Sequence, residues 1–229
     1  MRYAVYYTPP SGTALALAAA DWLGRDAFGE RVPRAPDARH GAIVAEPARY
    51  GFHATLKAPF RLAEGQTAEA LDHALATFCA VRSGPRIGSL ALARLGSFFA
   101  FVPETPDAGI AALEADAVER FEPFRAPLTE AETARRRPDR LNGRQRDHLA
   151  QWGYPHVLDQ FRFHMTLTGP CDDTNGSIEA ELTARFAGFL GRAYVLEGLA
   201  LFVQPDPDAP FRFHRYHSFA AEAASEPAT

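Results

Sequence analysis

The stretch YGFHATLKAPF, residues 50–60, decides how the rest of this sequence is understood. It places a histidine, a threonine and a lysine at alternate positions, His53, Thr55 and Lys57, with mainly apolar residues between them. Because successive side chains of a β-strand point to opposite faces, this alternation predicts a strand over 49–58 with one polar and one apolar face. Along such a strand His53 and Thr55 lie about 6.6 Å apart, so both can reach one small anion.

The same pattern occurs a second time in the second half of the chain. FHATLK at 52–57 is matched by FHMTLT at 163–168, and in both copies a proline follows two residues later. The second copy predicts a strand over 161–168, and the polar face of that strand carries His164, Thr166 and Thr168. Two copies so far apart indicate two similar halves rather than a repeat array.

The remaining strand and helix signals follow each other in mixed order. Further strands are expected at 2–8, 86–94, 97–103, 193–203 and 211–219, and helices at 11–22, 67–81, 107–121 and 177–190, with another helix beginning near Thr129. Each motif strand is therefore followed by a helix and two strands. If a pseudo-twofold axis relates the halves, the two polar faces surround one cleft.

Composition limits the classes of partner. The chain has 229 residues, 47% of them hydrophobic, which is enough to bury a core as one domain or as two closely joined lobes. Its net charge of −4 offers no general basic field for long nucleic acid. Cys79 and Cys171 show no metal or disulfide spacing, and neither a secretion signal nor a membrane-spanning apolar run is present. We therefore expect a cytoplasmic protein that uses no membrane partner; its oligomeric state does not follow from the sequence.

An arginine-rich segment lies before the second motif. Six arginines fall between Arg135 and Arg146. Such a run is typical of a solvated helical surface, but it also fits a flap over an anionic ligand. In the second case Arg135 and Arg136 would contact that ligand.

Paired histidines and threonines suit chemistry at a phosphoryl group. One imidazole can take a proton from water while an imidazolium gives a proton to a departing alkoxide, and threonine hydroxyls can donate to non-bridging oxygens. Zinc would need three or four good ligands, and no third ligand lies in register with His53 and His164, so we predict no metal site. No dinucleotide, Walker or nucleophile-elbow motif is present.

The paired motifs His53-Ala54-Thr55-Leu56 and His164-Met165-Thr166-Leu167 resemble the signature of the two-histidine (2H) phosphoesterase superfamily. More closely, MRYAVYYTPP, RYGFHATLKAPFRL, FRAPLT and WGYPHVLDQFRFHMTLTGP resemble a bacterial branch labelled as putative phosphonate-metabolism proteins. This resemblance covers about residues 1–219.

The resemblance implies a fold and a set of roles. The implied fold is α+β, with two similar lobes whose antiparallel sheets face each other across a central cleft, and no cofactor is implied. His53 and His164 would be the acid–base pair, and Thr55 and Thr166 would hold phosphoryl oxygens. We expect one bilobal domain over 1–219, with a segment at 123–160 that could cover the cleft, and a disordered tail over 220–229.

Three functions remain open at this point. The favoured one is a metal-independent phosphoesterase that hydrolyses a small cyclic phosphate or phosphodiester linked to phosphonate or sugar-phosphate metabolism. The alternatives are a non-catalytic protein that binds a phosphorylated or phosphonate ligand, and an enzyme acting on 2′,3′-cyclic RNA ends. Lys57, the only lysine in the chain, is expected to contact the substrate from the cleft face, as is Thr168. Which histidine is the acid does not follow from the sequence.

Overall fold

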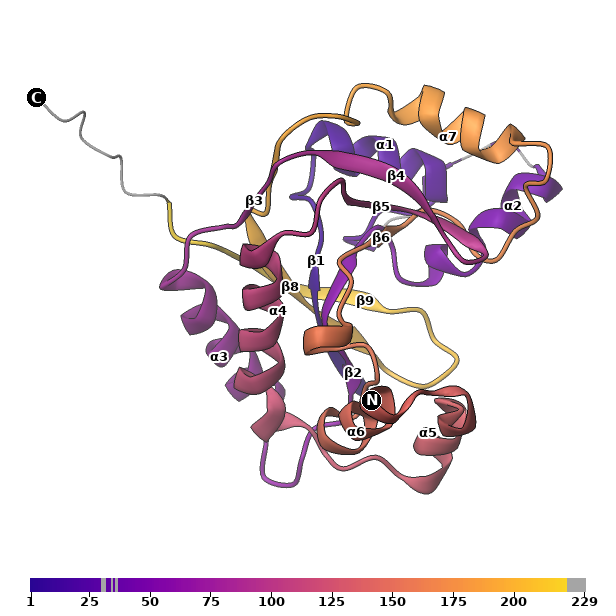
Figure 1. Cartoon of the computed structure of the whole chain (residues 1–229). Helices are drawn as coiled ribbons and strands as arrows, with labels where there is room; N and C mark the ends of the chain where they lie inside the picture. Colours follow the sequence, from indigo (N-terminus) through magenta and orange to yellow (C-terminus); the bar gives the residue numbers. More distant parts are fainter. Residues whose placement is uncertain (30–31, 34, 36, 222–229) are drawn as a thin grey trace, which may run out of the picture.

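The computed structural model describes residues 1–29, 32–33, 35 and 37–221, and its fold is α+β with antiparallel sheets (Figure 1). The larger sheet has four strands in the order β2-β1-β8-β9. These strands are β1 (Arg2–Tyr7), β2 (Ala54–Phe60), β8 (Gly198–Gln204) and β9 (Arg212–Ser218). The first motif therefore lies in β2, at one edge of this sheet.

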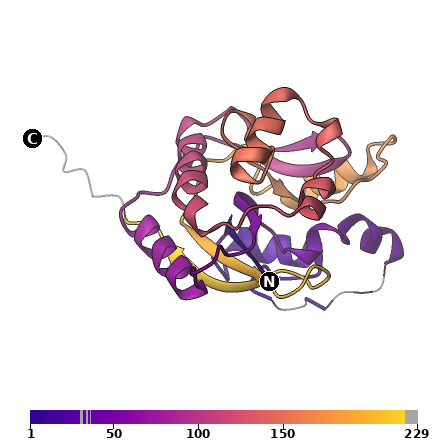
Figure 2. The same cartoon turned by 90° about the horizontal axis from the view of Figure 1, so that it is seen from below.

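The second motif lies in a separate sheet of three strands, ordered β4-β5-β6. They are β4 (Leu90–Leu95), β5 (Phe98–Pro103) and β6 (Met165–Thr166), and a short ladder joins β3 (Arg86–Ile87) to β7 (Tyr194–Val195). Each motif strand thus shares a sheet with the two strands that follow the other motif. This exchange of strands between the halves runs in both directions, as a pseudo-twofold relation requires. Seen from below, the two sheets lie on different sides of the molecule (Figure 2).

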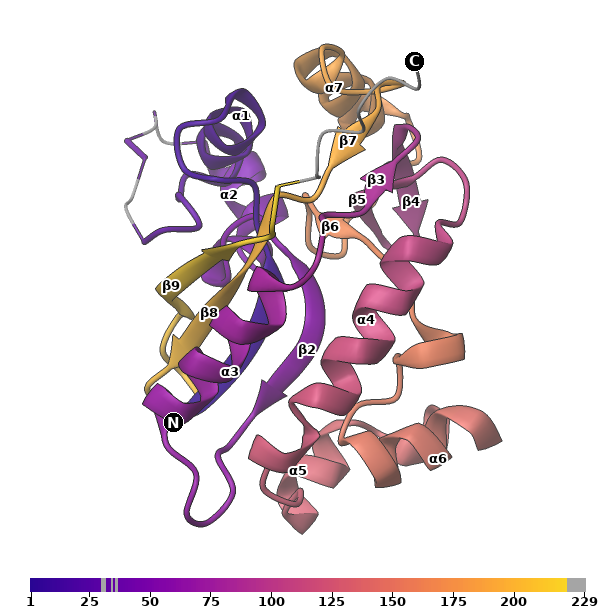
Figure 3. The same ribbon diagram turned by 90° about the vertical axis from the view of Figure 1, so that its left-hand side faces the viewer.

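Seven α-helices surround the sheets within the described residues. They are α1 (Ala14–Leu23), α2 (Ala38–Val44), α3 (Ala68–Ala80), α4 (Ala108–Arg120), α5 (Glu130–Arg135), α6 (Gly143–Trp152) and α7 (Ser177–Phe186). Four short 3-10 helices are η1 (Pro47–Arg49), η2 (Glu122–Phe124), η3 (Pro138–Arg140) and η4 (Leu158–Gln160). Figures 1 and 3 show α5 and α6 at one end of the molecule and α1, α2 and α7 at the other.

The two faces of β1 serve different purposes. Tyr3, Val5 and Tyr7 belong to the main core, which α3 and α4 cover and which also includes side chains of the second sheet. Ala4 and Tyr6 point the other way, into a smaller cluster with Phe202 of β8. The face of the sheet that carries Tyr6 is the one left for the site, because helices occupy the other.

Both motif strands are shorter than predicted. The first begins at Ala54 rather than near residue 49, because Gly51 has a φ of 79°, a left-handed conformation that does not continue a strand. A Cβ at Gly51 would also lie 2.5 Å from the Cα of Ala27, so only glycine fits there. The second contains only Met165–Thr166 instead of 161–168, because the amides of Leu167 and Thr168 both bond to the Phe99 carbonyl and end the ladder.

Other boundaries differ in smaller ways. The strand expected at 86–94 is broken between Ile87 and Leu90, and the one expected at 193–203 is broken before Gly198. The first helix begins at Ala14, after the cap residue Thr13, rather than at residue 11, whereas Thr67 and Thr129 cap helices that begin where they were expected. Helices α2 and α6 were not predicted as separate elements. Residues 222–229 of the tail expected over 220–229 lie outside the described part of the chain.

Candidate active site

One cavity lies between the two motif strands and brings both histidines together. Its volume is about 480 Å³. The motif side chains on its wall are His53, Thr55, His164, Thr166 and Thr168. Within each motif the histidine and the threonine are only partly buried while the apolar residues beside them are buried, as the predicted alternation requires.

The two imidazoles are held in the same way. Nδ1 of His53 lies 2.9 Å from the carbonyl oxygen of Gly51, and Nδ1 of His164 lies 2.8 Å from that of Arg162, in each case two residues earlier in the chain. A carbonyl oxygen only accepts, so Nδ1 carries the hydrogen in both rings. Nε2 is then the remaining nitrogen of each ring. It can accept a proton when the ring is neutral and donate one when the ring is charged.

Burial lowers the pKa of both histidines. For His53 the pKa falls from 6.5 to about 4, mainly because burial disfavours the charged ring, with a further contribution from the nearby His164; the hydrogen bond to Gly51 opposes this shift. The pKa of His164 is also lowered by burial and by Arg162, against the hydrogen bond to its own carbonyl partner. An anion bound beside either ring would therefore stabilise its charged, imidazolium form.

Aromatic rings hold the imidazoles in place. The Tyr6 ring lies 4.1 Å from His53 between centroids, at an interplanar angle of 31°. Tyr50 lies 5.5 Å from His53, and Phe98 lies 5.9 Å from His164. Since these rings are themselves packed in the cavity wall, they restrict both histidines to a narrow range of orientations.

Thr168 has a different role from Thr55 and Thr166. Its hydroxyl oxygen accepts a 2.9 Å hydrogen bond from the Phe99 amide and lies 3.6 Å from the sulfur of Cys171. The side chain is buried, although it borders the cavity. Its hydroxyl thereby ties the motif to β5, and the contact of Thr168 with the substrate stays a prediction.

Lys57 does not reach the cavity. Its ammonium is buried, donates a 2.8 Å hydrogen bond to the carbonyl of Val118 and forms a 2.6 Å ion pair with Glu122. The predicted cleft-face position is wrong because the strand is not regular: Tyr6 pairs with Thr55 but Val5 pairs with Lys57, so an extra residue is inserted in β2. Such a bulge reverses the alternation, and Lys57 points toward α4.

The arginine-rich segment is divided between the cavity and the surface. Arg136 lines the cavity and lies over the Tyr154 ring, 4.9 Å from its centroid, whereas Arg135 is exposed and borders a separate hollow. Both had been expected to bind substrate, but the structure places only Arg136 at the site.

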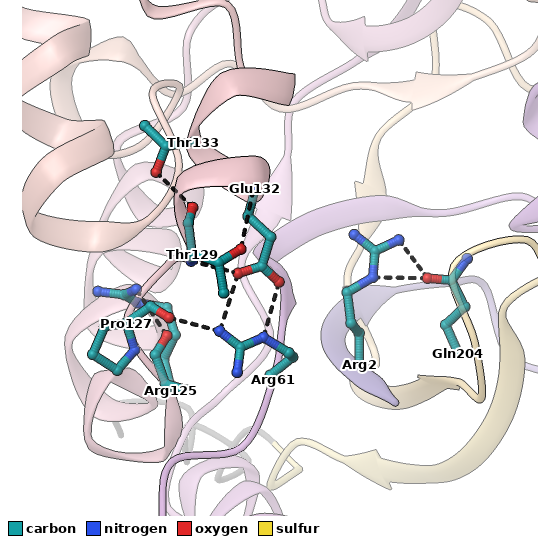
Figure 4. A network of polar contacts seen from close by, with 9 residues as sticks. Arg2, Arg61, Arg125, Pro127, Thr129, Glu132, Thr133 and Gln204 are labelled. Atoms are coloured by element: carbon teal, nitrogen blue, oxygen red, sulfur yellow. Dashed lines mark hydrogen bonds and ion pairs between the residues drawn. The ribbon is translucent and has the colours of Figure 1, made fainter.

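A polar network around Arg61 and Glu132 fixes helix α5, which ends directly before Arg136 (Figure 4). Arg61, directly after β2, donates to Glu132 at 2.9 and 3.0 Å and to the carbonyl of Pro127 at 2.7 Å. Glu132 also closes a capping box with Thr129, and hydrogen bonds from Arg61 lower its pKa to about 2. Helix α5 is thus fixed to the end of β2, and Arg136 follows directly after this helix.

Several residues of the cavity wall were not predicted from the sequence. They are Arg2, Tyr6, Glu46, Tyr50, Phe98 and Tyr154. The first two could have been found, because the strand alternation of RYAVYYT puts Arg2, Ala4 and Tyr6 on one face. Tyr154 belongs to an irregular segment, where no periodicity predicts where a side chain points.

The described residues lack two further features. No group of three or more histidine, cysteine, aspartate or glutamate side chains there is arranged to hold a metal ion. No helix in the same residues is both long enough and apolar enough to span a bilayer.

Some known proteins resemble this chain in structure and others resemble it in sequence. One solved structure, the crystal structure of TT0787 of Thermus thermophilus, covers 97% of this chain and 100% of its own, with a TM-score of 0.45 and 17% identity. Two proteins named ribose 1,5-bisphosphate phosphokinase PhnN are closer in sequence. The one from Janthinobacterium sp. (strain Marseille) is 40% identical over 173 residues, 73% of this chain and 38% of the relative. The one from Laribacter hongkongensis (strain HLHK9) is 39% identical over 221 residues, 94% of this chain and 51% of the relative.

The chain therefore spans about half or less of the length of these curated relatives. A family model also matches more than half of this chain. Residues 55–212 match it, a range that includes Thr55 of the first motif and all of the second. On this match, the chain belongs to the family described as "Protein of unknown function (DUF1045)".

Proposed function

We propose that this protein is a metal-independent phosphoesterase of the two-histidine type, which hydrolyses a small cyclic phosphate or phosphodiester. One observation carries the proposal: two imidazoles, which directly precede strands of different sheets, line one cavity, and each has its Nδ1 hydrogen committed to the carbonyl two residues earlier. Such matched tautomers leave two equivalent Nε2 atoms for acid–base work.

The proposed reaction is an in-line displacement at phosphorus. Nε2 of one neutral histidine takes a proton from water as the water oxygen bonds to phosphorus. The bond from phosphorus to the leaving oxygen breaks, and the other histidine, as imidazolium, gives its Nε2 proton to that oxygen. The Thr55 and Thr166 hydroxyls donate to the non-bridging oxygens, where negative charge gathers.

The size of the cavity supports a small substrate. Volumes of about 300–1,000 Å³ are usual for small-molecule sites, and the value of about 480 Å³ lies at the low end. This favours a nucleotide-sized or smaller molecule over an RNA end. The relatives are named for ribose 1,5-bisphosphate, a phosphorylated sugar, which supports a place in sugar-phosphate or phosphonate metabolism.

This chain offers less support for the kinase activity that the relatives' name states. A P-loop kinase of the Walker type needs a glycine-rich loop that ends in lysine and a hydroxyl residue. This sequence has no such motif, and its single lysine, Lys57, is buried in an ion pair with Glu122. We infer that the region shared with the relatives serves a step other than transfer from a nucleotide.

We also propose that residues 1–219 act as one bilobal domain and that the segment 123–160 covers part of the site. Arg136 and Tyr154, which come from this segment, line the cavity and support that role.

A substrate screen tests the proposal. Cyclic phosphates, phosphodiesters and phosphonates of graded size are incubated with the protein in the presence of a chelator, and hydrolysis is followed by phosphorus NMR. We expect turnover of at least one cyclic phosphate of mononucleotide size or smaller. Saturable binding without any turnover would instead indicate a ligand-binding protein, and a strong preference for oligonucleotides would indicate an RNA-end enzyme.

A further inference from the structure

The cavity has a second charged region besides the two histidines. The hollow that Arg135 borders adjoins this cavity, and three residues line both: Arg2, Pro59 and Arg136. The two histidines and the motif threonines line the cavity alone. The two arginines therefore stand at the end of the cavity nearest that hollow. Arg2 lies four residues from Tyr6 along β1, a Cα separation of roughly 13 Å at about 3.3 Å per residue.

Tyr6 connects the two regions. Its ring lies 4.1 Å from that of His53 between centroids, and Tyr6 lines the same cavity as Arg2 and Arg136. Burial raises the pKa of the Tyr6 hydroxyl well above its usual value, and neighbouring Tyr50 and Tyr154 raise it further, while Arg2 and Arg136 act in the opposite direction. The hydroxyl thus stays protonated beside two cations, and it can donate a hydrogen bond to an anion.

The two cations lack acidic partners among the described residues. Arg2 donates through Nε to the amide oxygen of Gln204 at 2.8 Å, which orients the guanidinium without neutralising it (Figure 4). Arg136 lies over the Tyr154 ring. Glu46 is the carboxylate on the cavity wall, and it lies beside Gly169, next to the second motif. Two guanidinium groups with tyrosines in the same cavity wall suit a phosphate, whose oxygens accept several charge-assisted hydrogen bonds.

We propose that the substrate carries a second, non-reacting phosphate, which binds to Arg2, Arg136 and the hydroxyls of Tyr6 and Tyr154. This rests on the proposed function for the reacting group and names the substrate class: a small polyol or sugar with a cyclic phosphate at one end and a phosphate monoester at the other.

A matched pair of substrates tests this. We would measure kcat/KM for ribose 2,3-cyclic phosphate and for the same compound with a 5-phosphate, using the parent protein, Arg136→Gln, Arg2→Met and the control Arg135→Gln. A lost charge-assisted hydrogen bond corresponds to about 10- to 100-fold. We expect the parent to prefer the 5-phosphorylated compound by at least that factor and the Arg136→Gln and Arg2→Met variants to lose the preference. Arg135→Gln, adjacent in sequence but outside the cavity, should keep it.

Two results would refute the second phosphate site. If Arg136→Gln lowers kcat/KM for both compounds by the same factor, Arg136 holds the reacting phosphoryl group and the second site does not exist. A parent without preference for the 5-phosphate overturns the proposal as well.

Binding measurements separate this inference from the proposed function. If the parent hydrolyses neither compound, the phosphoesterase is in doubt, but titration calorimetry with ribose 5-phosphate still tests the second site. We expect binding to the parent and to Arg135→Gln, and at least about 10-fold weaker binding to Arg136→Gln. Equal affinity for all three proteins would refute the site whatever the outcome for catalysis.

Discussion

Replacing Lys57 with methionine should destabilise the fold and leave the chemistry almost unchanged. The Lys57 side chain is 3% exposed and bonds to Glu122 and to the Val118 carbonyl. Methionine is of similar length, so the main loss is the charge. Glu122 and the buried Glu114 would then lose their shared cation, and burial already raises the pKa of Glu114 to about 7 despite Lys57.

The loss of stability expected for Lys57→Met depends on the contacts that Glu122 keeps. Removing one partner of a buried pair costs about 3–5 kcal/mol. Glu122 is 24% exposed and keeps Arg125, whose Nε lies 3.0 Å from it, so we expect the low end, about 3 kcal/mol. For a chain of this size that corresponds to a fall in Tm of about 6–12 °C.

The assay is thermal and urea unfolding, with kcat/KM measured well below the lowest Tm. Arg144→Met is the control, because it removes an exposed pair with Asp159 and should cost less than about 1 kcal/mol. If Lys57→Met kept the parent Tm but lost kcat/KM more than about tenfold, Lys57 would belong to the substrate site and the packing described above would be wrong.

Three more predictions follow from the site. Because the pKa values of His53 and His164 are both lowered, the bell-shaped profile of kcat/KM should peak below pH 6.5, and a peak above pH 7.5 would contradict the described burial. A chelator should leave turnover unchanged; loss that zinc or manganese restores would indicate a metal mechanism. Glu132→Gln should raise KM severalfold by loosening Arg136, and it should lower the free energy of unfolding at pH 7. Since the Glu132 pKa is lowered to about 2, its stabilising effect is present above about pH 4.5 and fades as pH falls toward 2, so parent and variant should converge in acid, as urea titrations at several pH values would show.

The sequence predicted the parts of the site that depend on local alternation. His53 with Thr55, and His164 with Thr166, lie on polar strand faces around one cavity, as their spacing indicated. The two motif strands also lie in two different antiparallel sheets, as the repeat of this spacing led us to expect.

Features that depend on irregular backbone were not predictable in the same way. The bulge that turns Lys57 toward Glu122 depends on how β2 pairs with β1, and nothing in the letters ATLKAPF marks an inserted residue. Likewise Arg135 and Arg136 are neighbouring residues of the same type, so the sequence does not distinguish them. Only the end of helix α5 determines which one faces the cavity.

The aromatic wall was missed for a related reason. Tyr50 and Tyr154 come from turns and short irregular segments, and they reach the cavity only through tertiary packing. Tyr6 was missed too, although it could have been found, because strand alternation places it on one face with Arg2.

The most direct test of acid–base catalysis by two histidines is kcat/KM for His53→Ala and His164→Ala on the best cyclic phosphate, with chelator present. Each variant should lose about 10²–10⁴-fold, the range for a missing general acid or base, while near-parental unfolding curves show that it is folded. A folded variant of either histidine that retained near-parental kcat/KM would contradict the account.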